Sequence, residues 1–357
     1  MIRVLIVDDS AVIREHLQHI LISESDITVA GFAMDGEQAV ELARRMRPDV
    51  ITMDLNMPRL NGIEATRRIM EDTPAPIVVV SGDWSPDQMA TVFKAMEAGA
   101  VAVLETPLGM DHPRFEESAR QFLETIRLMA GLKVMKRRVS RGDVDTRVAG
   151  IARVVSKQSA TVRLVAIGAS LGGPPALHAI LTSLKKDFRM PVVICQHIAP
   201  GFLEGLVEWL TATTGFPVHI ATHGESLLAG HAYMAPDAHH MGVAINHQVT
   251  LSNSEPEAGI RPAVSYLLRS VARSYGPGAV GVLLTGMGRD GAEELKVMRD
   301  RGALTIAQDK KSSVVHGMPG EAIRLGGAMY VLDPAAIAAM LNEISGTQSN
   351  LLSSVTL

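Results

Sequence analysis

The sequence predicts an α/β protein made of two doubly wound domains, each a mainly parallel sheet with helices on both faces. Short apolar runs alternate with helix-like segments over residues 1–130, and the same alternation resumes over residues 161–347. Such alternation is typical of parallel strands joined by crossover helices. The stretch between them, residues 131–160, lacks the pattern and is rich in Lys and Arg. We expect it to be an interdomain linker, with binding to an acidic receptor surface as the alternative.

The totals limit the class of protein. With 357 residues the chain is long enough for two separate cores. Its net charge of −4 gives no reason to expect nucleic acid as a partner. The single cysteine, Cys195, excludes an internal disulfide and fits a reducing compartment. The amino terminus lacks signal-peptide features, and no apolar run reaches the roughly 18 residues that span a membrane, so we expect a cytoplasmic protein without membrane insertion.

The first domain is expected to hold a five-stranded parallel sheet. Ser10 and Asp35 are suited to begin helices as N-caps, and Gly99 is suited to end one. The predicted strands are residues 2–7, 27–33, 50–53, 77–80 and 100–104, and the predicted helices lie near 10–22, 36–46, 62–72, 86–98 and 113–130.

Acidic residues follow two of these strands. Asp8 and Asp9 come after the first strand and Asp54 after the third, so all three reach the same edge of the sheet. Carboxylates so placed repel one another unless a hard cation lies among them, and Mg²⁺ is the expected ion. Taken alone, they could equally be solvated loop acids.

The run that begins at Asp54, Asp-Leu-Asn-Met-Pro-Arg-Leu-Asn-Gly, resembles the phosphoacceptor loop of response-regulator receiver domains. Ser81, at the end of the fourth strand, matches their hydroxyl position. The resemblance implies that Asp54 accepts a phosphoryl group from a histidine kinase. It also implies that Asp8, Asp9, Asp54 and the carbonyl of Asn56 hold Mg²⁺, and that Ser81 binds the phosphoryl oxygens.

One switch position departs from that family. Receivers usually carry Lys-Pro after the fifth strand, where this chain has Thr106-Pro107 preceded by Glu105. A threonine hydroxyl cannot form an ion pair with a phosphoryl group. We therefore expect phosphorylation to activate this protein weakly or in an unusual way.

In the second domain, a serine follows the first apolar run. Ser170 lies between the run ending at Ile167 and the sequence Gly172-Gly173-Pro174-Pro175, which suits the start of a helix. This is the position where open α/β sheets bind ligands and where free backbone N–H groups can bind developing negative charge. A nucleophilic serine, a phosphate-binding loop and a simple tight turn all fit this stretch.

The second domain is expected to hold seven strands, followed by a loose tail at residues 348–357. The predicted strands are residues 162–167, 191–195, 217–220, 231–234, 279–284, 303–306 and 328–332.

His197 and Asp290 follow two other strands of this domain. If the three strands are neighbours, both side chains meet Ser170 at the carboxyl edge of the sheet. His197 could then take the proton of the serine, while Asp290 fixes the imidazole tautomer and stabilises its cation. Backbone N–H groups near Ser170 and in the Gly286-Met287-Gly288 turn could stabilise an oxyanion.

Each of these residues also has a structural interpretation. His197 could be a satisfied structural histidine, and Asp290 could cap the helix that starts directly after it. Cys195 is a rival nucleophile, but it is expected inside its strand rather than beyond the strand end. His239 and His240 have no third ligand at metal spacing, so we expect no zinc site there.

Three stretches of this domain resemble the active-site motifs of the CheB protein-glutamate methylesterase family. They are Gly-Ala-Ser-Leu-Gly-Gly around Ser170, Gln-His-Ile-Ala-Pro-Gly-Phe around His197, and Leu-Thr-Gly-Met-Gly-Arg-Asp-Gly ending after Asp290. The resemblance implies a Ser170–His197–Asp290 triad with an oxyanion N–H from Met287, and no cofactor for the esterase reaction.

By the same resemblance, the enzyme hydrolyses glutamyl methyl esters on chemoreceptors, releases methanol and deamidates receptor glutamines. The unphosphorylated receiver would obstruct the active site, and phosphorylation at Asp54 would favour an open form. The chain departs from the family at Leu171 and at Pro262-Ala263-Val264-Ser265. We expect these changes to affect substrate preference and surface contacts, not the triad.

Two alternatives remain open at this stage. The glycine-rich sheet edge could belong to a non-catalytic regulator that binds an anion or a nucleotide. A binding module would tolerate Ser170→Ala, whereas a hydrolase would lose turnover. The esterase could also serve a receptor array outside flagellar motility, with altered phosphorelay control.

Overall fold

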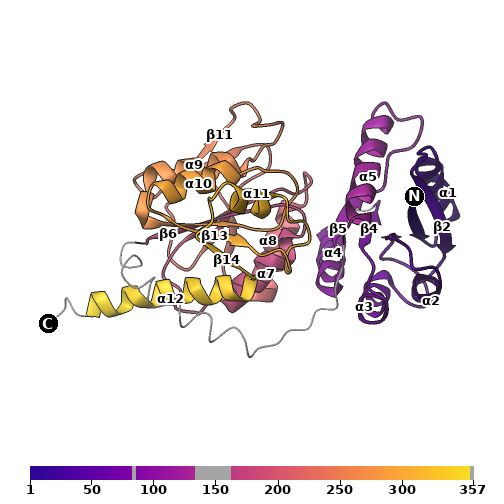
Figure 1. Cartoon of the computed structure of the whole chain (residues 1–357), viewed down its shortest axis with the longest axis horizontal. Coiled ribbons are helices and arrows are strands. Elements are labelled where there is room, and N and C mark those ends of the chain that lie inside the picture. Colours follow the sequence, from indigo (N-terminus) through magenta and orange to yellow (C-terminus); the bar gives the residue numbers. More distant parts are fainter. Residues whose placement is uncertain (83–85, 133–161, 354–357) are drawn as a thin grey trace. The chain divides into compact units, whose positions relative to one another are not determined.

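The structure is a computed structural model that describes residues 1–82, 86–132 and 162–353. It contains two compact units, Met1–Arg138 and Val139–Leu357, each with its own sheet and helices (Figure 1). From residue 133 onward, the predicted linker lies outside the described residues.

The first unit has a five-stranded parallel sheet in the order β2-β1-β3-β4-β5. Helix α1 contacts α5, while α2, α3 and α4 contact one another in succession, so helices cover both faces. The strands are β1 (Ile2–Val7), β2 (Ile27–Ala33), β3 (Val50–Met53), β4 (Ile77–Ser81) and β5 (Ala102–Glu105). The helices are α1 (Ala11–Ile22), α2 (Gly36–Met46), α3 (Gly62–Asp72), α4 (Pro86–Ala98) and α5 (Phe115–Ala130).

The predicted helix caps of this unit are confirmed. The Ser10 hydroxyl accepts a hydrogen bond from the Ile13 N–H, and the Asp35 carboxylate accepts one from the Gln38 N–H. Gly99 follows α4 with a φ of +120°, a conformation that favours glycine. Residues suited to capping, Ser10, Asp35 and Gly99, therefore mark these helix boundaries in the sequence itself.

The second unit has a seven-stranded parallel sheet in the order β14-β13-β12-β6-β7-β9-β8. Helices α9 and α10 contact each other on one face, and α7 and α12 contact each other on the opposite face (Figure 1). The strands are β6 (Leu164–Ala169), β7 (Val192–Gln196), β8 (Val218–Ile220), β9 (Ala232–Met234), β12 (Ala279–Leu283), β13 (Leu304–Gln308) and β14 (Tyr330–Leu332). The helices are α7 (Gly173–Ser183), α8 (Leu203–Thr214), α9 (Val264–Ser274), α10 (Ala292–Asp300), α11 (Met318–Arg324) and α12 (Pro334–Ser353), with a 3₁₀ turn η2 (Gly276–Gly278).

Two features of this unit differ from the prediction. An antiparallel hairpin, β10 (His240–Val243) and β11 (Val249–Ser252), was not expected. Its strands are short and begin among polar residues, so the sequence shows little alternation there. Helix α12 continues to Ser353, into the range expected to be a loose tail, and residues 354–357 lie outside the described part.

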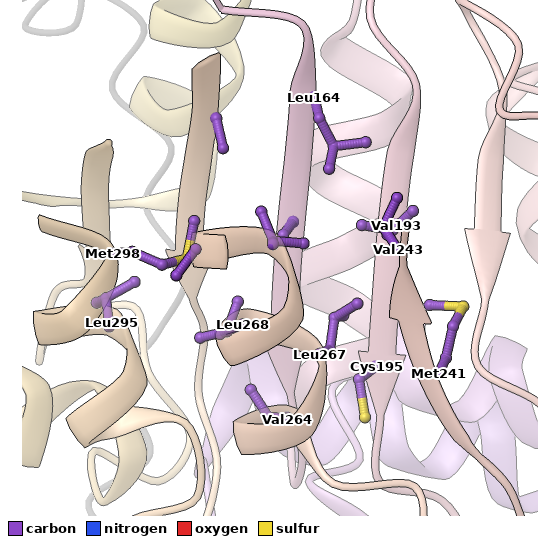
Figure 2. Close-up of a cluster of buried hydrophobic side chains, with 14 of the residues drawn as sticks. Leu164, Val193, Cys195, Met241, Val243, Val264, Leu267, Leu268, Leu295 and Met298 are labelled. Carbon is purple, nitrogen blue, oxygen red and sulfur yellow. The ribbon is translucent and has the colours of Figure 1, made fainter. Parts of the chain in front are cut away.

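The core of the second unit encloses the only cysteine of the chain. Cys195 lies in β7, fully buried, in the same apolar cluster as Val264 and Leu267 of α9 (Figure 2). Burial raises the pKa of its thiol well above the ordinary value. The expectation that Cys195 lies inside its strand is confirmed, and a buried neutral thiol is a poor nucleophile.

Within the described residues, no helix has the combination of length and apolar character needed to cross a membrane.

We predict that Gly168→Ala destabilises the second unit. A Cβ at position 168 in β6 would lie 2.2 Å from Cγ1 of Val264 and 3.0 Å from Cδ1 of Leu283. Overpacking of this kind typically costs about 1–3 kcal/mol. The free energy of unfolding, measured by urea denaturation, should fall by that amount, and an unchanged midpoint would contradict the packing described here.

Candidate functional site

The candidate active site lies where three adjacent parallel strands end. Strand β6 is paired with β12 on one side and with β7 on the other, and Gly168 is in register with both Leu283 and Cys195. The segments that follow these strands carry Ser170, His197 and Asp290. Because the strand ends coincide, the three segments meet at one edge of the sheet.

Main-chain hydrogen bonds fix the backbone of Ser170 and His197. The Ser170 N–H donates to the carbonyl of Thr285 over 3.0 Å, and the His197 N–H donates to the carbonyl of Ala169 over 2.9 Å. Gly286 approaches the serine so closely that a Cβ there would lie 2.7 Å from the Ser170 Cβ. A side chain at position 286 would therefore displace the candidate nucleophile.

The imidazole of His197 faces the carboxylate of Asp290. Nε2 of His197 lies 2.9 Å from Oδ2 of Asp290, and the two side chains are only 16% and 10% exposed. The pair is within ion-pair distance, although Nε2 is not aligned for a hydrogen bond of good geometry. This orientation leaves Nδ1 as the nitrogen available to a serine proton. Among the described residues, Ser170 Oγ makes no hydrogen bond to the imidazole ring. Catalytic hydrogen bonds often form with good geometry only when substrate is bound.

The Asp290 carboxylate is held by the start of helix α9. Its two oxygens accept hydrogen bonds from the N–H groups of Val264, over 2.7 Å, and Ser265, over 2.8 Å. The N-cap of α9, Ala263, has no side chain that could make such bonds, so Asp290 supplies the missing cap from a distant segment. The suggestion that Asp290 caps the helix after it is wrong, because α10 has Gly291 as its N-cap.

The surroundings of Asp290 keep it ionised. Burial by itself would raise the pKa of this carboxyl, but the close contact with His197 and the hydrogen bonds from Ser265 outweigh burial and lower the pKa below its ordinary value. The positive end of the α9 dipole also favours the carboxylate. A buried negative charge beside His197 is what an imidazolium would need during the reaction.

Two backbone N–H groups are available near Ser170. The N–H of Ser170 is already used by Thr285, but those of Leu171 and Met287 donate no hydrogen bond within the described residues. Met287 lies in the turn after β12 and is 57% exposed. Its N–H is therefore free to bind an oxyanion.

The receiver acids also form a cluster. One carboxylate oxygen each from Asp8, Asp9 and Asp54 lie within 4.8 Å of one another. Burial, with repulsion from Asp54 and Asp9, raises the pKa of Asp8 to about 6, and burial also raises the pKa of Asp54. Carboxylate oxygens crowded in this way fit a hard divalent cation such as Mg²⁺.

The other positions singled out by the receiver resemblance lie at or just after the ends of β3, β4 and β5. Asn56 is exposed in the loop after β3, close behind Asp54. Ser81 ends β4 and is buried, and its carbonyl accepts a hydrogen bond from the N–H of Thr106 over 2.9 Å. Thr106 thus occupies the strand end where a receiver usually carries lysine.

Ser265 has a role in this site that the sequence did not reveal. Its hydroxyl donates to Oδ1 of Asp290 and accepts a hydrogen bond from the Gly291 N–H over 2.9 Å. The sequence showed that this position departs from the family pattern, but the change was expected to affect substrate preference or surface contacts. The structure corrects that expectation, because Ser265 contacts the candidate triad itself.

We predict that Ser265→Ala destabilises the protein in a pH-dependent way. A hydrogen bond to a charged group contributes about 1.5–3 kcal/mol. The stability due to the low pKa of Asp290 is present above the ordinary carboxyl pKa of about 4 and is lost as the pH falls through the lower folded value. The loss of unfolding free energy in Ser265→Ala should therefore be full near pH 7 and shrink in acid.

The matched control is Ser274→Ala, at the other end of α9, whose hydroxyl donates to the neutral carbonyl of Val243 over 2.8 Å. Its effect on stability should not vary with pH. Equal pH dependence in the two variants would contradict the coupling between Ser265 and Asp290.

Comparison with known proteins identifies both parts of the chain. Residues 165–341 match the CheB methylesterase family and residues 4–116 match the response regulator receiver domain family. The protein-glutamate methylesterase/protein-glutamine glutaminase of Nitrosospira multiformis is 52% identical over 344 residues, which cover 96% of this chain and 97% of that protein. A Geobacter metallireducens protein with the same name, numbered 4, is 51% identical over 348 residues, covering 97% and 99% of the two chains.

Among solved structures, the Thermotoga maritima CheB methylesterase catalytic domain aligns with a TM-score of 0.50 and 38% identity, covering 51% of this chain and 98% of that chain. The family models, the nearly full-length relatives and this structure all identify the same two parts. The chain therefore belongs to the protein-glutamate methylesterase/protein-glutamine glutaminase family of response regulators.

Proposed function

We propose that this protein is a cytoplasmic chemotaxis response regulator that hydrolyses glutamate methyl esters on chemoreceptors and deamidates receptor glutamines. The observation that supports the proposal is that Ser170, His197 and Asp290 follow three adjacent parallel strands, with Nε2 of His197 2.9 Å from Oδ2 of Asp290. Relatives that carry this activity in their names cover almost the whole chain.

The proposed reaction is acyl transfer through the serine. Ser170 Oγ attacks the ester carbonyl while Nδ1 of His197 takes the hydroxyl proton, and Asp290 stabilises the resulting imidazolium. The N–H of Met287 binds the oxyanion. His197 then returns the proton to the leaving oxygen, releasing methanol, and a water molecule hydrolyses the acyl-enzyme by the same steps in reverse. A glutamine side chain would release ammonia instead.

The proposed regulation is by phosphoryl transfer to Asp54. We assign residues 1–130 to the receiver domain, 131–160 to the linker and 161–347 to the catalytic domain. A histidine kinase would supply the phosphoryl group, and Asp8, Asp9, Asp54 and the carbonyl of Asn56 would hold Mg²⁺. The ion would neutralise the crowded carboxylates and the phosphoryl oxygens, and Ser81 would hydrogen-bond the phosphoryl group. Thr106 supplies a hydroxyl in place of an ammonium.

Ser170→Ala tests the catalytic proposal. Methanol release from methylated receptor should fall by roughly 10⁴–10⁶-fold, because the nucleophile is lost while the fold is retained. Circular dichroism provides the control for folding. Retained turnover in the folded variant would exclude Ser170 as nucleophile. An inactive wild type whose ligand binding is unchanged by the substitution would instead favour the anion-binding alternative.

Thr106→Lys tests the regulatory proposal. The new ammonium can pair with a phosphoryl group on Asp54, so a small-molecule phosphoryl donor with Mg²⁺ should stimulate methanol release more in this variant than in the wild type. Asp54→Ala, which lacks the acceptor, should not respond to the donor. Strong stimulation of the wild type, with no gain in Thr106→Lys, would show that the missing lysine does not limit the switch.

A further inference from the structure

A buried carboxamide connects the backbones of the candidate nucleophile and base. Gln196 is the last residue of β7 and is only 4% exposed. Its Nε2 donates to the carbonyl of Ser170 over 2.8 Å and to the carbonyl of His197 over 2.8 Å. One side chain thus holds the main chain of both residues.

The orientation of this amide follows from its partners. Two carbonyl oxygens within 2.8 Å require the NH₂ group on that side, because a flipped amide would set its own oxygen against both of them. Oε1 has no conventional hydrogen-bond partner among the described residues and lies against Gly173, where a Cβ would be 2.0 Å away.

Gly173 completes the connection. Its N–H donates to the carbonyl of Ser170 over 2.8 Å, so this carbonyl accepts from both Gln196 and the first residue of α7. The serine loop, the histidine segment and the start of α7 are therefore joined at one buried amide. The arrangement leaves no room for a side chain at position 173.

We propose that Gln196 is a positioning residue that sets the separation between Ser170 and His197. The inference rests on the proposed function, because it assumes that these two residues react as nucleophile and base. The hydrogen bonds of Gln196 go to the main chain of Ser170 and His197, so it acts by fixing the two backbones from which the candidate reacting side chains project. A misplacement of about 1 Å in such a pair can lower the rate about 10²-fold.

Gln196→Met is the test variant, because methionine has a similar length but no donor. Asn342→Leu is the matched control. Asn342 is also a buried carboxamide, 9% exposed, that joins two main-chain groups. Its Nδ2 donates to the carbonyl of Ser183 and its Oδ1 accepts from the N–H of Lys185, each over 2.9 Å, at the far end of α7.

The expected result separates positioning from general stability. Both variants should melt at lower temperature than the wild type. Only Gln196→Met should lose kcat for methanol release, by about 10–100-fold, with KM within about twofold. Labelling of Ser170 by a fluorophosphonate should slow in parallel, whereas Asn342→Leu should retain both rates. A kcat in folded Gln196→Met equal to that of Asn342→Leu, or a loss confined to KM, would overturn the proposal.

A second variant covers the case in which Gln196→Met does not fold. Gln196→Glu keeps the shape but replaces the NH₂ group with an oxygen facing two carbonyl oxygens, so its kcat should also fall below that of Asn342→Leu. Wild-type turnover in Gln196→Glu would overturn the positioning role alone. Turnover in Ser170→Ala would overturn the serine mechanism first, so the two failures can be told apart.

Discussion

The parallel pairing of β12, β6 and β7 is the constraint on which the second unit depends. It brings three segments that are far apart in the chain to one edge of a sheet, with their strand ends in register. Small residues then allow the segments to approach, since Gly286 lies against Ser170 and Gly173 lies against the Gln196 side chain. The strand order thus determines where the site residues lie, and their side chains then determine what chemistry the site can perform.

Behind the candidate triad lies a second set of polar contacts that fixes the start of α9. His240 is fully buried and stacks on Tyr266 with 4.7 Å between ring centroids. Its Nδ1 accepts a hydrogen bond from the Ala263 N–H over 3.2 Å, which leaves the proton on Nε2, 3.1 Å from the carbonyl of Glu255. The histidine pair for which no metal role was expected thus contributes a residue that supports the segment holding Asp290.

Much of this could be predicted from the sequence. Strand and helix positions followed from hydrophobic alternation, and Ser10 and Asp35 carried the local chemistry of helix caps. Ser170, His197 and Asp290 each follow a buried strand, so their meeting required only that the strands be neighbours. The contacts that join distant segments could not be predicted from the sequence. The capping of α9 by Asp290, the role of Ser265 and the Gln196 amide depend on tertiary packing, and none leaves a periodic signal.

The burial of Cys195 has a practical consequence. Since this is the only sulfhydryl in 357 residues and it is enclosed in the core with a raised pKa, reagents that attack thiolates will find little of it in the folded state. Cysteines introduced at exposed positions in either unit can therefore carry fluorophores or spin probes without removal of the native one. The natural sequence is therefore already a suitable background for measuring distances between such labels.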